Sequence, residues 1–218
     1  MMPINISTEI YLIRHGKTQC AAKGQYIGST DVPLSAHGMQ QARLLAERLQ
    51  TLQVDACYCS MLTRCRETAS LLAAPHRLPV VPVAALREID YGRWEGLTLD
   101  EIAAQHPTVY AAWRNDPATV RPPGGESGVE VLRRVRPAME QIASAHPGQR
   151  VLVIAHRTVN RLWLCDVLGY PLASYRQAVG QDFTAVNILA YAPPPTAHLS
   201  GTHSRFSVIV LNDTSHLQ

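Results

Sequence analysis

Long apolar runs are missing from this sequence of 218 residues. The longest apolar stretches, such as residues 151–155, are far too short to span a bilayer. Residues 1–7 also lack the basic region and apolar run that mark a secretory signal peptide. Because both features are absent, we expect no association with membranes and predict a cytoplasmic location.

The sequence also lacks paired cysteines. Its five cysteines are an odd number and contain no C-x-x-C pair, so they indicate neither a disulfide framework nor a zinc site. We expect reduced thiols. Cys57 and Cys59 stand two residues apart in a strand-like segment, which places them on the same side of a sheet and favours packing over metal binding.

A strong net charge is absent as well. The formal charge is +3 at pH 7, with 17% charged residues. Arg133, Arg134 and Arg136 form the only tight basic cluster, and on a helix we expect such a run to face solvent. The sequence therefore does not favour nucleic-acid binding, and any preference for anions has to come from specific sites.

What the sequence does contain is enough apolar material for a large core. The hydrophobic content of 46% excludes a disordered chain and predicts one globular domain over residues 1–218. Short alternating or continuously apolar segments predict strands at residues 9–14, 54–60, 80–86, 150–155, 185–191 and 206–211. Helical spacing predicts a helix that Ser35 caps and whose apolar positions extend to Leu52, a helix through Leu72, and helices at residues 99–113, 129–145 and 158–168.

The alternation of strands and helices predicts a three-layer α/β/α sandwich with a mainly parallel sheet. Residues 150–155 are apolar throughout, which is typical of a central strand buried on both faces. The last two predicted strands are expected to pair as an edge hairpin, joined by a loop that contains Pro193, Pro194 and Pro195. Strand signals stop between about residues 97 and 146, which predicts a helical insertion over the C-terminal edge of the strands.

Four side chains with useful chemistry come at the ends of predicted strands. His15, Arg64 and Glu88 follow the first three strands, and His156 ends the fourth. In parallel α/β sheets, the reactive crevice lies outside the carboxyl ends of the strands. We therefore expect these four side chains to converge at one edge of the sheet.

These residue types suit phosphoryl transfer, which needs an in-line nucleophile, positive donors for the equatorial oxygens and an acid for the leaving oxygen. His15 can attack through one ring nitrogen if a hydrogen bond holds the other. Arg14 and Arg64 offer planar, permanently charged forks for phosphate, and His156 can donate to the same oxygens. Glu88 can serve as acid and base. Because arginines supply the positive charge, we expect neither a metal nor a cofactor.

Residues 12–18, L-I-R-H-G-K-T, resemble the R-H-G signature of the histidine phosphatase superfamily, in its phosphoglycerate mutase-like branch. Further segments match in order over nearly the whole chain: G-S-T-D-V-P-L-S at 28–35, S-M-L-T-R-C-R-E-T-A at 60–69, R-E-I-D-Y-G-R-W-E-G at 87–96, P-G-G-E-S at 123–127, A-H-R at 155–157 and L-N-D-T-S-H-L at 211–217. The resemblance implies a phosphate pocket of Arg14, His15, Arg64 and His156, a phosphohistidine intermediate, and Glu88 as general acid and base.

The sequence departs from this family pattern at three positions. Lys17 stands where many members have an acidic residue, Ala21 replaces a phosphate-contacting asparagine, and Arg157 replaces a common glycine. We interpret these departures as a change in substrate choice, and predict Lys17, Thr30 and Arg157 as specificity residues. Arg157 either reads a second anionic group or pairs with a carboxylate such as Asp182.

The predicted function is hydrolysis of a small phosphomonoester metabolite. Two alternatives stay open: a phosphoglycerate mutase-type phosphotransferase, and a non-catalytic protein that binds phosphorylated ligands. Mutases that resemble this family tend to be longer, which favours hydrolysis. The sequence does not select among phosphoglycerate, phosphoserine, α-ribazole phosphate and sugar phosphates, and it leaves open whether the chain forms a homodimer.

Residues outside the predicted pocket also carry expectations. Glu126 is a candidate helix cap, with a substrate-side role as the alternative. Trp94, Trp113 and Trp163 are expected in or near the helical layer, with a place in the cleft as the alternative for Trp94. The remaining histidines are expected on the surface or in loops, namely His37, His76, His106, His146, His198, His203 and His216.

Overall fold

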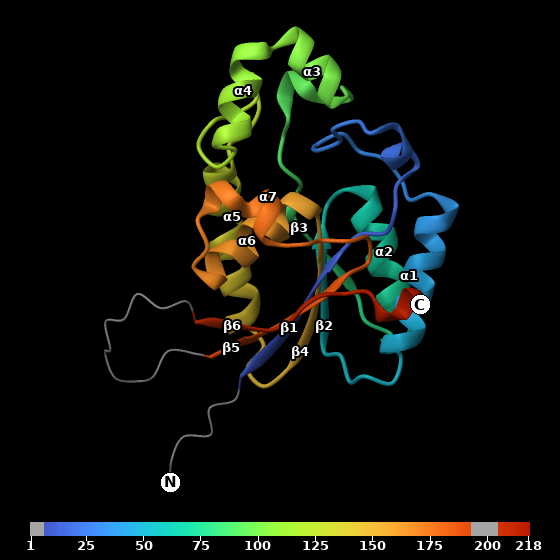
Figure 1. The fold of residues 1–218 in the computed structure, drawn as a ribbon. Helices are drawn as coiled ribbons and strands as arrows, with labels where there is room; N and C mark the ends of the chain where they lie inside the picture. Colours follow the sequence, from blue (N-terminus) through green and yellow to red (C-terminus); the bar gives the residue numbers. More distant parts are fainter. Residues whose placement is uncertain (1–6, 193–204) are drawn as a thin grey trace, which may run out of the picture.

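The computed structural model describes residues 7–192 and 205–218 (Figure 1). Within these residues, six strands form one mixed sheet with seven α-helices around it, which confirms the predicted α/β fold. The strands are β1 (Thr8–Arg14), β2 (Ala56–Ser60), β3 (Val80–Val83), β4 (Arg150–Ala155), β5 (Val186–Tyr191) and β6 (Phe206–Asp213). The helices are α1 (Ala36–Leu49), α2 (Thr63–Ala73), α3 (Leu99–Gln105), α4 (Pro107–Asn115), α5 (Gly128–Ser144), α6 (Arg157–Leu168) and α7 (Tyr175–Ala178).

The strands of the sheet have the order β3-β2-β4-β1-β5-β6. The strands β1 to β4 run parallel, while β5 is antiparallel to β1 and β6 is antiparallel to β5. The predicted edge hairpin is therefore confirmed, and the proline-containing loop predicted around residues 193–195 lies outside the described residues. At the opposite edge, β3 accommodates Pro82 because this strand pairs with β2 alone.

Alternating side chains of the central strands build a core on each face of the sheet. Ile10 and Leu12 of β1 pack with residues of α5 and α6. Tyr11 and Ile13 pack with α1 and α2 on the opposite face. Figure 1 shows these two helical layers on either side of the sheet, with α3 and α4 standing beyond them at the end where the parallel strands finish. The carboxyl edge of the strands thus lies beneath α3 and α4.

The helical region between residues 97 and 146 differs from our prediction in two respects. The single helix expected at residues 99–113 is two helices, because α4 begins at Pro107, whose ring favours a helix start and whose missing N–H prevents continuation of α3. Helix α5, which we had grouped with the insertion, packs against β1 and α6 as part of a layer. The strand predicted at residues 80–86 ends at Val83 and continues as a 3-10 turn.

Local predictions about capping and cysteine packing are confirmed. The hydroxyl of Ser35 accepts a hydrogen bond from the N–H of Gly38 and so caps α1. Cys57 and Cys59 are both buried in the core between the sheet and the layer of α1 and α2. No helix in the described part of the chain is both long and apolar enough to cross a membrane.

The tryptophans and histidines outside the site also have defined places. Trp94, Trp113 and Trp163 are buried in the core that contains α5 and α6, which excludes the cleft alternative for Trp94. His37 is exposed, and the partly buried histidines are His76, His106, His146 and His216. His198 and His203 lie outside the described residues.

Candidate active site

His15 directly follows β1, at the middle of the sheet, and is only 6% exposed. Its backbone N–H donates to the carbonyl of Ala155 at the end of β4. Nδ1 of the ring lies 2.8 Å from the carbonyl oxygen of Gly16. A carbonyl can only accept, so Nδ1 carries the proton and the lone pair of Nε2 is free.

The next residue, Gly16, allows α1 to start close to the site. A Cβ at position 16 would lie 2.5 Å from the carbonyl oxygen of Gly38, and a Cβ at position 38 would lie 2.0 Å from the carbonyl oxygen of Lys17. Side chains at these positions would force the two segments apart. The pair of glycines therefore fixes the loop after His15 against the first turn of α1.

Arg64 stands in the first turn of α2 and is 2% exposed. Its Nη1 donates to the carbonyl of Thr30 at 2.9 Å and its Nη2 to the carbonyl of Gly28 at 2.6 Å. Its Nε donates to Nδ1 of His156 at 3.3 Å. Three of the five guanidinium N–H groups are used in this way, which leaves two for a ligand.

Arg14 is the last residue of β1, and its side chain is fixed by the segment after α7. Its Nη1 donates to the carbonyl of Gln181 at 2.8 Å, and its guanidinium lies 3.7 Å from the ring centroid of Phe183. Burial, followed by the charge of Arg157, lowers the pKa of Arg14. Its Nε is buried with no partner among the described residues, so Arg14 keeps unused donors at the site.

His156 is fully buried between the end of β4 and the start of α6. Its ring meets that of His15 edge-on, with 5.2 Å between centroids. Because Nδ1 accepts from Arg64, Nε2 carries the proton and donates to the hydroxyl of Ser60 at 2.7 Å. Both nitrogens thus have protein partners, and the predicted donation from His156 to phosphate requires a proton on Nδ1.

Both central histidines are held neutral. Burial, followed by the charges of Arg64 and Arg14, lowers the pKa of His15 well below its ordinary value of 6.5. Burial, followed by the charge of Arg64 and by His15, lowers the pKa of His156 in the same direction. A neutral imidazole keeps a lone pair, which a nucleophile needs.

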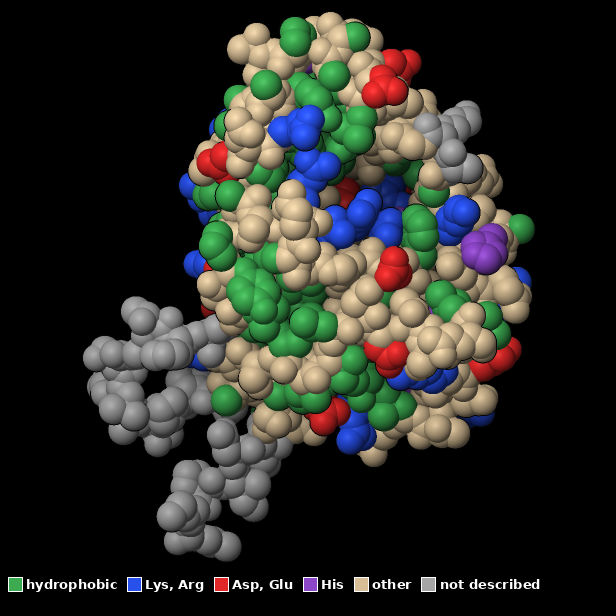
Figure 2. Space-filling model, in the orientation of Figure 1, with side chains coloured by type: hydrophobic (Ala, Val, Ile, Leu, Met, Phe, Trp, Pro, Cys, Tyr) green, Lys and Arg blue, Asp and Glu red, His purple; other side chains and the backbone are tan. Residues whose placement is uncertain are grey.

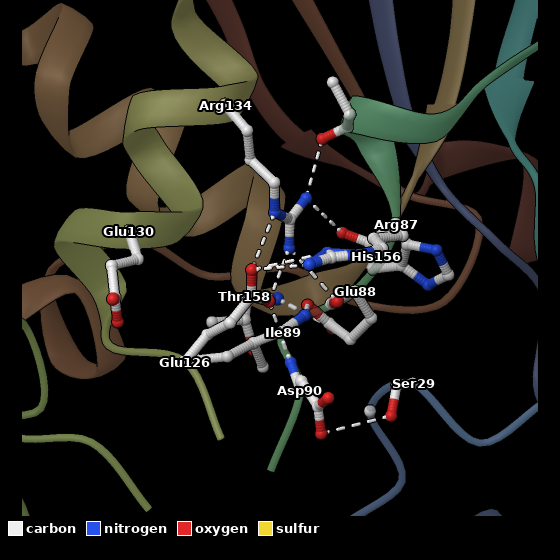
Figure 3. Close-up of polar contacts among 12 residues, drawn as sticks. Ser29, Arg87, Glu88, Ile89, Asp90, Glu126, Glu130, Arg134, His156 and Thr158 are labelled. Atoms are coloured by element: carbon white, nitrogen blue, oxygen red, sulfur yellow. Dashed lines mark hydrogen bonds and ion pairs between the residues drawn. The ribbon is translucent and has the colours of Figure 1, made fainter. Parts of the chain in front are cut away.

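Glu88 lies beside the start of α6 and is 5% exposed (Figure 3). Its Oε1 accepts from the N–H of Ile89 at 2.9 Å, and its Oε2 accepts from the N–H of Thr158 at 3.1 Å. The carboxyl group is therefore fixed by backbone groups from two segments. The structure brings His15, Arg64, Glu88 and His156 to the carboxyl ends of the strands, where the sequence placed them.

The backbone around Glu88 is supported by Arg134, which we had expected to face solvent, and by Glu126, which we had expected as a helix cap or on the substrate side. Arg134 does not face solvent: its side chain is 17% exposed and donates to the carbonyls of Ala85, Arg87 and Glu88. Glu126 is not a helix cap, because Ser127 caps α5. Glu126 instead pairs with Arg87 and Arg134 (Figure 3).

Glu95 supports the site through contacts that our sequence analysis did not predict. Its carboxylate accepts the backbone N–H groups of Gly28, Ser29 and Thr30 and the hydroxyl of Thr30 at 2.5 Å. The segment 28–30 is therefore held on one side by Glu95 and on the other by Arg64. The one sequence feature that could have pointed to Glu95 is its position next to Gly96, in a segment without helical or strand spacing. The hydroxyl of Thr30 is therefore already engaged in a hydrogen bond to Glu95.

The other two predicted specificity residues have side chains with no ion pair among the described residues. The ammonium of Lys17 has no carboxylate partner there, and its backbone N–H donates to Gln41. Arg157 is exposed at the start of α6. It does not pair with Asp182, whose carboxylate accepts from Asn212 instead. The alternative of an Arg157–Asp182 pair is therefore not found.

The geometry defines a pocket with a nucleophilic imidazole, a carboxyl group and a concentration of positive charge. Figure 2 shows Lys and Arg side chains gathered around a hollow below the end of the molecule formed by α3 and α4. Among the residues that the structure describes, no three His, Cys, Asp or Glu side chains come together as a metal site. The sequence profile of the histidine phosphatase superfamily (branch 1) matches residues 10–198. The chain therefore belongs to the histidine phosphatase superfamily.

Several of the proteins that this chain resembles over most of their length are named as phosphatases. The chain is 31% identical over 209 residues to phosphoserine phosphatase 1 of Hydrogenobacter thermophilus, which covers 96% of this chain and 94% of that protein. It is 32% identical over 162 residues to adenosylcobalamin/alpha-ribazole phosphatase of Escherichia coli, covering 74% and 80%. The solved structure of Bacillus stearothermophilus YhfR superposes with a TM-score of 0.84 at 30% identity, covering 97% and 100%. The chain is accordingly a hydrolase of the phosphatase type.

Proposed function

We propose that this enzyme transfers the phosphoryl group of a small phosphomonoester to Nε2 of His15 and then to water. The observation that carries the proposal is the hydrogen bond from Nδ1 of His15 to the carbonyl of Gly16. It fixes the tautomer in which Nε2 is free to attack. The lowered pKa of His15 supports the same role, since the ring stays unprotonated at neutral pH.

In the first step, Nε2 of His15 bonds to phosphorus as the bond to the leaving oxygen breaks. Arg14 and Arg64 direct their unused N–H groups to the equatorial oxygens, where negative charge is concentrated. Glu88, in its protonated form, gives its proton to the leaving oxygen. The carboxyl group is well placed for this role because the N–H groups of Ile89 and Thr158 fix its orientation.

In the second step, water replaces the leaving group. The carboxylate of Glu88 takes a proton from the water, the water oxygen bonds to phosphorus, and the P–N bond breaks with its electron pair returning to Nε2. His156 forms the wall of the pocket beside His15. The negative charge of bound phosphate favours protonation of its Nδ1, and His156 then donates to the same oxygens as Arg64.

The His15→Ala variant tests the nucleophile. We expect it to lower turnover of p-nitrophenyl phosphate about a thousandfold or more, because the pocket then retains only its electrostatics. Brief reaction with labelled ester should leave acid-labile, alkali-stable phosphate on the wild type and none on His15→Ala. Exposed His37 provides the matched control, and His37→Ala should behave as the wild type does.

Five results would contradict the proposal. Labelled phosphate on His15→Ala, or an acid-stable label on the wild type, would move the nucleophile elsewhere. Loss of wild-type turnover in EDTA, with recovery on adding magnesium or zinc, would show that arginines do not supply the charge. Recovery of an isomerised ester in place of free phosphate would identify a mutase, and binding without turnover would identify a non-catalytic phospho-ligand protein.

A further inference from the structure

The arginines around the proposed pocket exceed what one phosphate needs. Arg14 and Arg64 suffice for the equatorial oxygens of a phosphomonoester, yet helices α6 and α7 supply further arginines near the same pocket. None of these arginines has a salt bridge within the described part of the chain. The group consists of Arg14, Arg64, Arg157, Arg161 and Arg176. Such an excess of unpaired positive charge is costly unless a ligand neutralises it.

Arg157 and Arg161 lie four residues apart on α6 and therefore on one face of that helix. Arg157 is exposed, and its side chain makes no hydrogen bond to the described residues. Arg161 is partly buried, and its Nε is buried without a partner among the described residues. The charge of Arg157 acts on both Arg161 and Arg14, lowering the pKa of each after the larger effect of burial. Arg157 and Arg161 therefore lie near each other and near Arg14.

Arg176 approaches the same place from α7, which packs on α6. Its Nη2 donates to the hydroxyl of Tyr26 at 3.2 Å, and its guanidinium lies 4.5 Å from the ring centroid of Trp113. The ring of Tyr26 in turn meets that of Tyr91 edge-on, with 4.9 Å between centroids. The aromatic side chains thus fix Arg176 without neutralising its charge.

The aromatic residues also connect Arg176, through a chain of contacts, to the start of α6. The hydroxyl of Tyr91 lies 3.3 Å from that of Thr158, the residue next to Arg157. The charge of Arg157 acts on Tyr26, which Arg176 contacts directly. Arg157, Arg161 and Arg176 therefore lie near one another on α6 and α7, on the side of the phosphate pocket where α4 supplies Trp113.

We propose that Arg157, Arg161 and Arg176 form a second anion-binding subsite, and that the preferred substrate is a phosphomonoester with another anionic group. This inference rests on the proposed function, because the subsite is defined relative to the phosphate pocket. A carboxylate and a second phosphate share the required chemistry. The reacting phosphate binds Arg14 and Arg64, while the second anion accepts hydrogen bonds from the subsite.

Matched pairs of esters test the subsite. The ester 3-phosphoglycerate carries a carboxylate that glycerol 3-phosphate lacks, and fructose 1,6-bisphosphate carries a phosphate that fructose 6-phosphate lacks. We expect the wild type to have a kcat/KM about tenfold or more higher for one or both of the doubly anionic esters. The pair with the larger preference identifies the second anion as a carboxylate or a phosphate.

Single variants then test which arginines of the subsite cause the preference for the ester with a second anionic group. Arg157→Gln and Arg161→Gln should each lower kcat/KM about tenfold for the preferred ester, mainly through KM, and change its singly anionic partner less than about threefold. Arg176→Gln should do the same, but because Arg176 also packs on Trp113, the test relies on the exposed Arg157. Arg43, exposed on α1, provides the control variant Arg43→Gln, which should leave both esters unchanged.

The outcomes separate this inference from the proposed function. Equal loss on both members of a pair, or no preference in the wild type, would overturn the subsite while His15 still became phosphorylated. Absence of phosphohistidine and of turnover with every ester would overturn the proposed function itself. If the wild type hydrolyses p-nitrophenyl phosphate but none of the four esters, their inhibition constants against that reaction supply the same comparison.

Discussion

At the scale of single residues, the two central histidines are kept neutral at a cost to stability. Burial is the main cause that lowers the pKa of both His15 and His156 well below 6.5. In the unfolded chain, each imidazole regains an ordinary pKa near 6.5. Below that pH the unfolded state binds more protons than the native state, so acid favours unfolding.

We predict that the free energy of unfolding falls as the pH is lowered from about 7 to about 5, by up to about 1.4 kcal/mol per pH unit for each of these histidines. Urea unfolding of the wild type and of His15→Gln at several pH values, without phosphate, measures how much His15 contributes to the pH dependence of the free energy of unfolding. The variant should have the shallower slope. Other histidines with a lowered pKa, such as His76 and His216, are present in both proteins and cancel. Equal slopes of the free energy of unfolding against pH would show that His15 is protonated in the native state as readily as in the unfolded chain.

The residues that could be predicted are those whose position follows from strand ends. His15, Arg64, Glu88 and His156 each lie at or shortly after the end of a segment with a strand pattern, and parallel strands finish at one edge. Glu95 could not be found in this way, because its partners are backbone N–H groups of a segment without regular spacing. Such contacts depend on tertiary structure and leave no periodic signal in the sequence.

At the scale of elements, the segment 28–30 is a part of the proposed pocket without regular secondary structure. It has no helical or strand hydrogen bonds of its own, and its position depends on Glu95 and Arg64. Because Arg64 donates to the carbonyls of Gly28 and Thr30, movement of this segment would also release Arg64. Glu95 therefore positions Arg64, which we propose binds phosphate, through the backbone between them.

We predict that Glu95→Gln lowers kcat/KM about tenfold, because it removes charge-assisted hydrogen bonds that each contribute about 1.5–3 kcal/mol. The control is Glu101→Gln, which also removes a carboxylate that accepts a backbone N–H, in the capping box of α3. We expect that control to keep kcat/KM within about twofold of the wild type. Steady-state kinetics on one phosphate ester compares the three proteins. Similar losses in both variants would contradict a positioning role of Glu95.

Elements with strong periodicity were predicted well, and their tertiary placement was not. The pattern of α5 identified a helix close to its observed bounds, but it could not show that its apolar residues, such as Val131 and Val135, face the sheet. The division at Pro107 could have been read from proline chemistry, since the apolar spacing continues across it. Arg134 was misplaced because its carbonyl partners lie in an irregular segment.

At the scale of the whole molecule, the far end of the sequence supports the pocket at its start. The side chain of Asn212 accepts from the N–H of Asp182 and donates to its carboxylate, both at 2.8 Å. This contact holds the segment that supplies the Gln181 carbonyl and the Phe183 ring to Arg14. The end of β6 therefore fixes the orientation of Arg14 on β1, which we propose binds phosphate.

We predict that Asn212→Gly raises KM for a phosphate ester about three- to tenfold, the effect of losing hydrogen bonds with a net contribution of about 0.5–1.5 kcal/mol each. Glycine adopts the observed φ of 50° without strain, so the side-chain contacts are the main loss. Ile209→Ala, at a 59% exposed position of the same strand, provides the control. An unchanged KM in Asn212→Gly would show that the segment holds its place without β6.

The position of β1 between β4 and β5 has a consequence for how the enzyme is made. Both flanking strands come from the last third of the sequence, so the nucleophile leaves the ribosome long before the strands that will hold it exist. Until then β1 is an apolar strand with two open edges, which is a risk for aggregation. We therefore expect a nascent chain that already contains His15 to be inactive until β4 and β5 have been synthesised and have paired with β1.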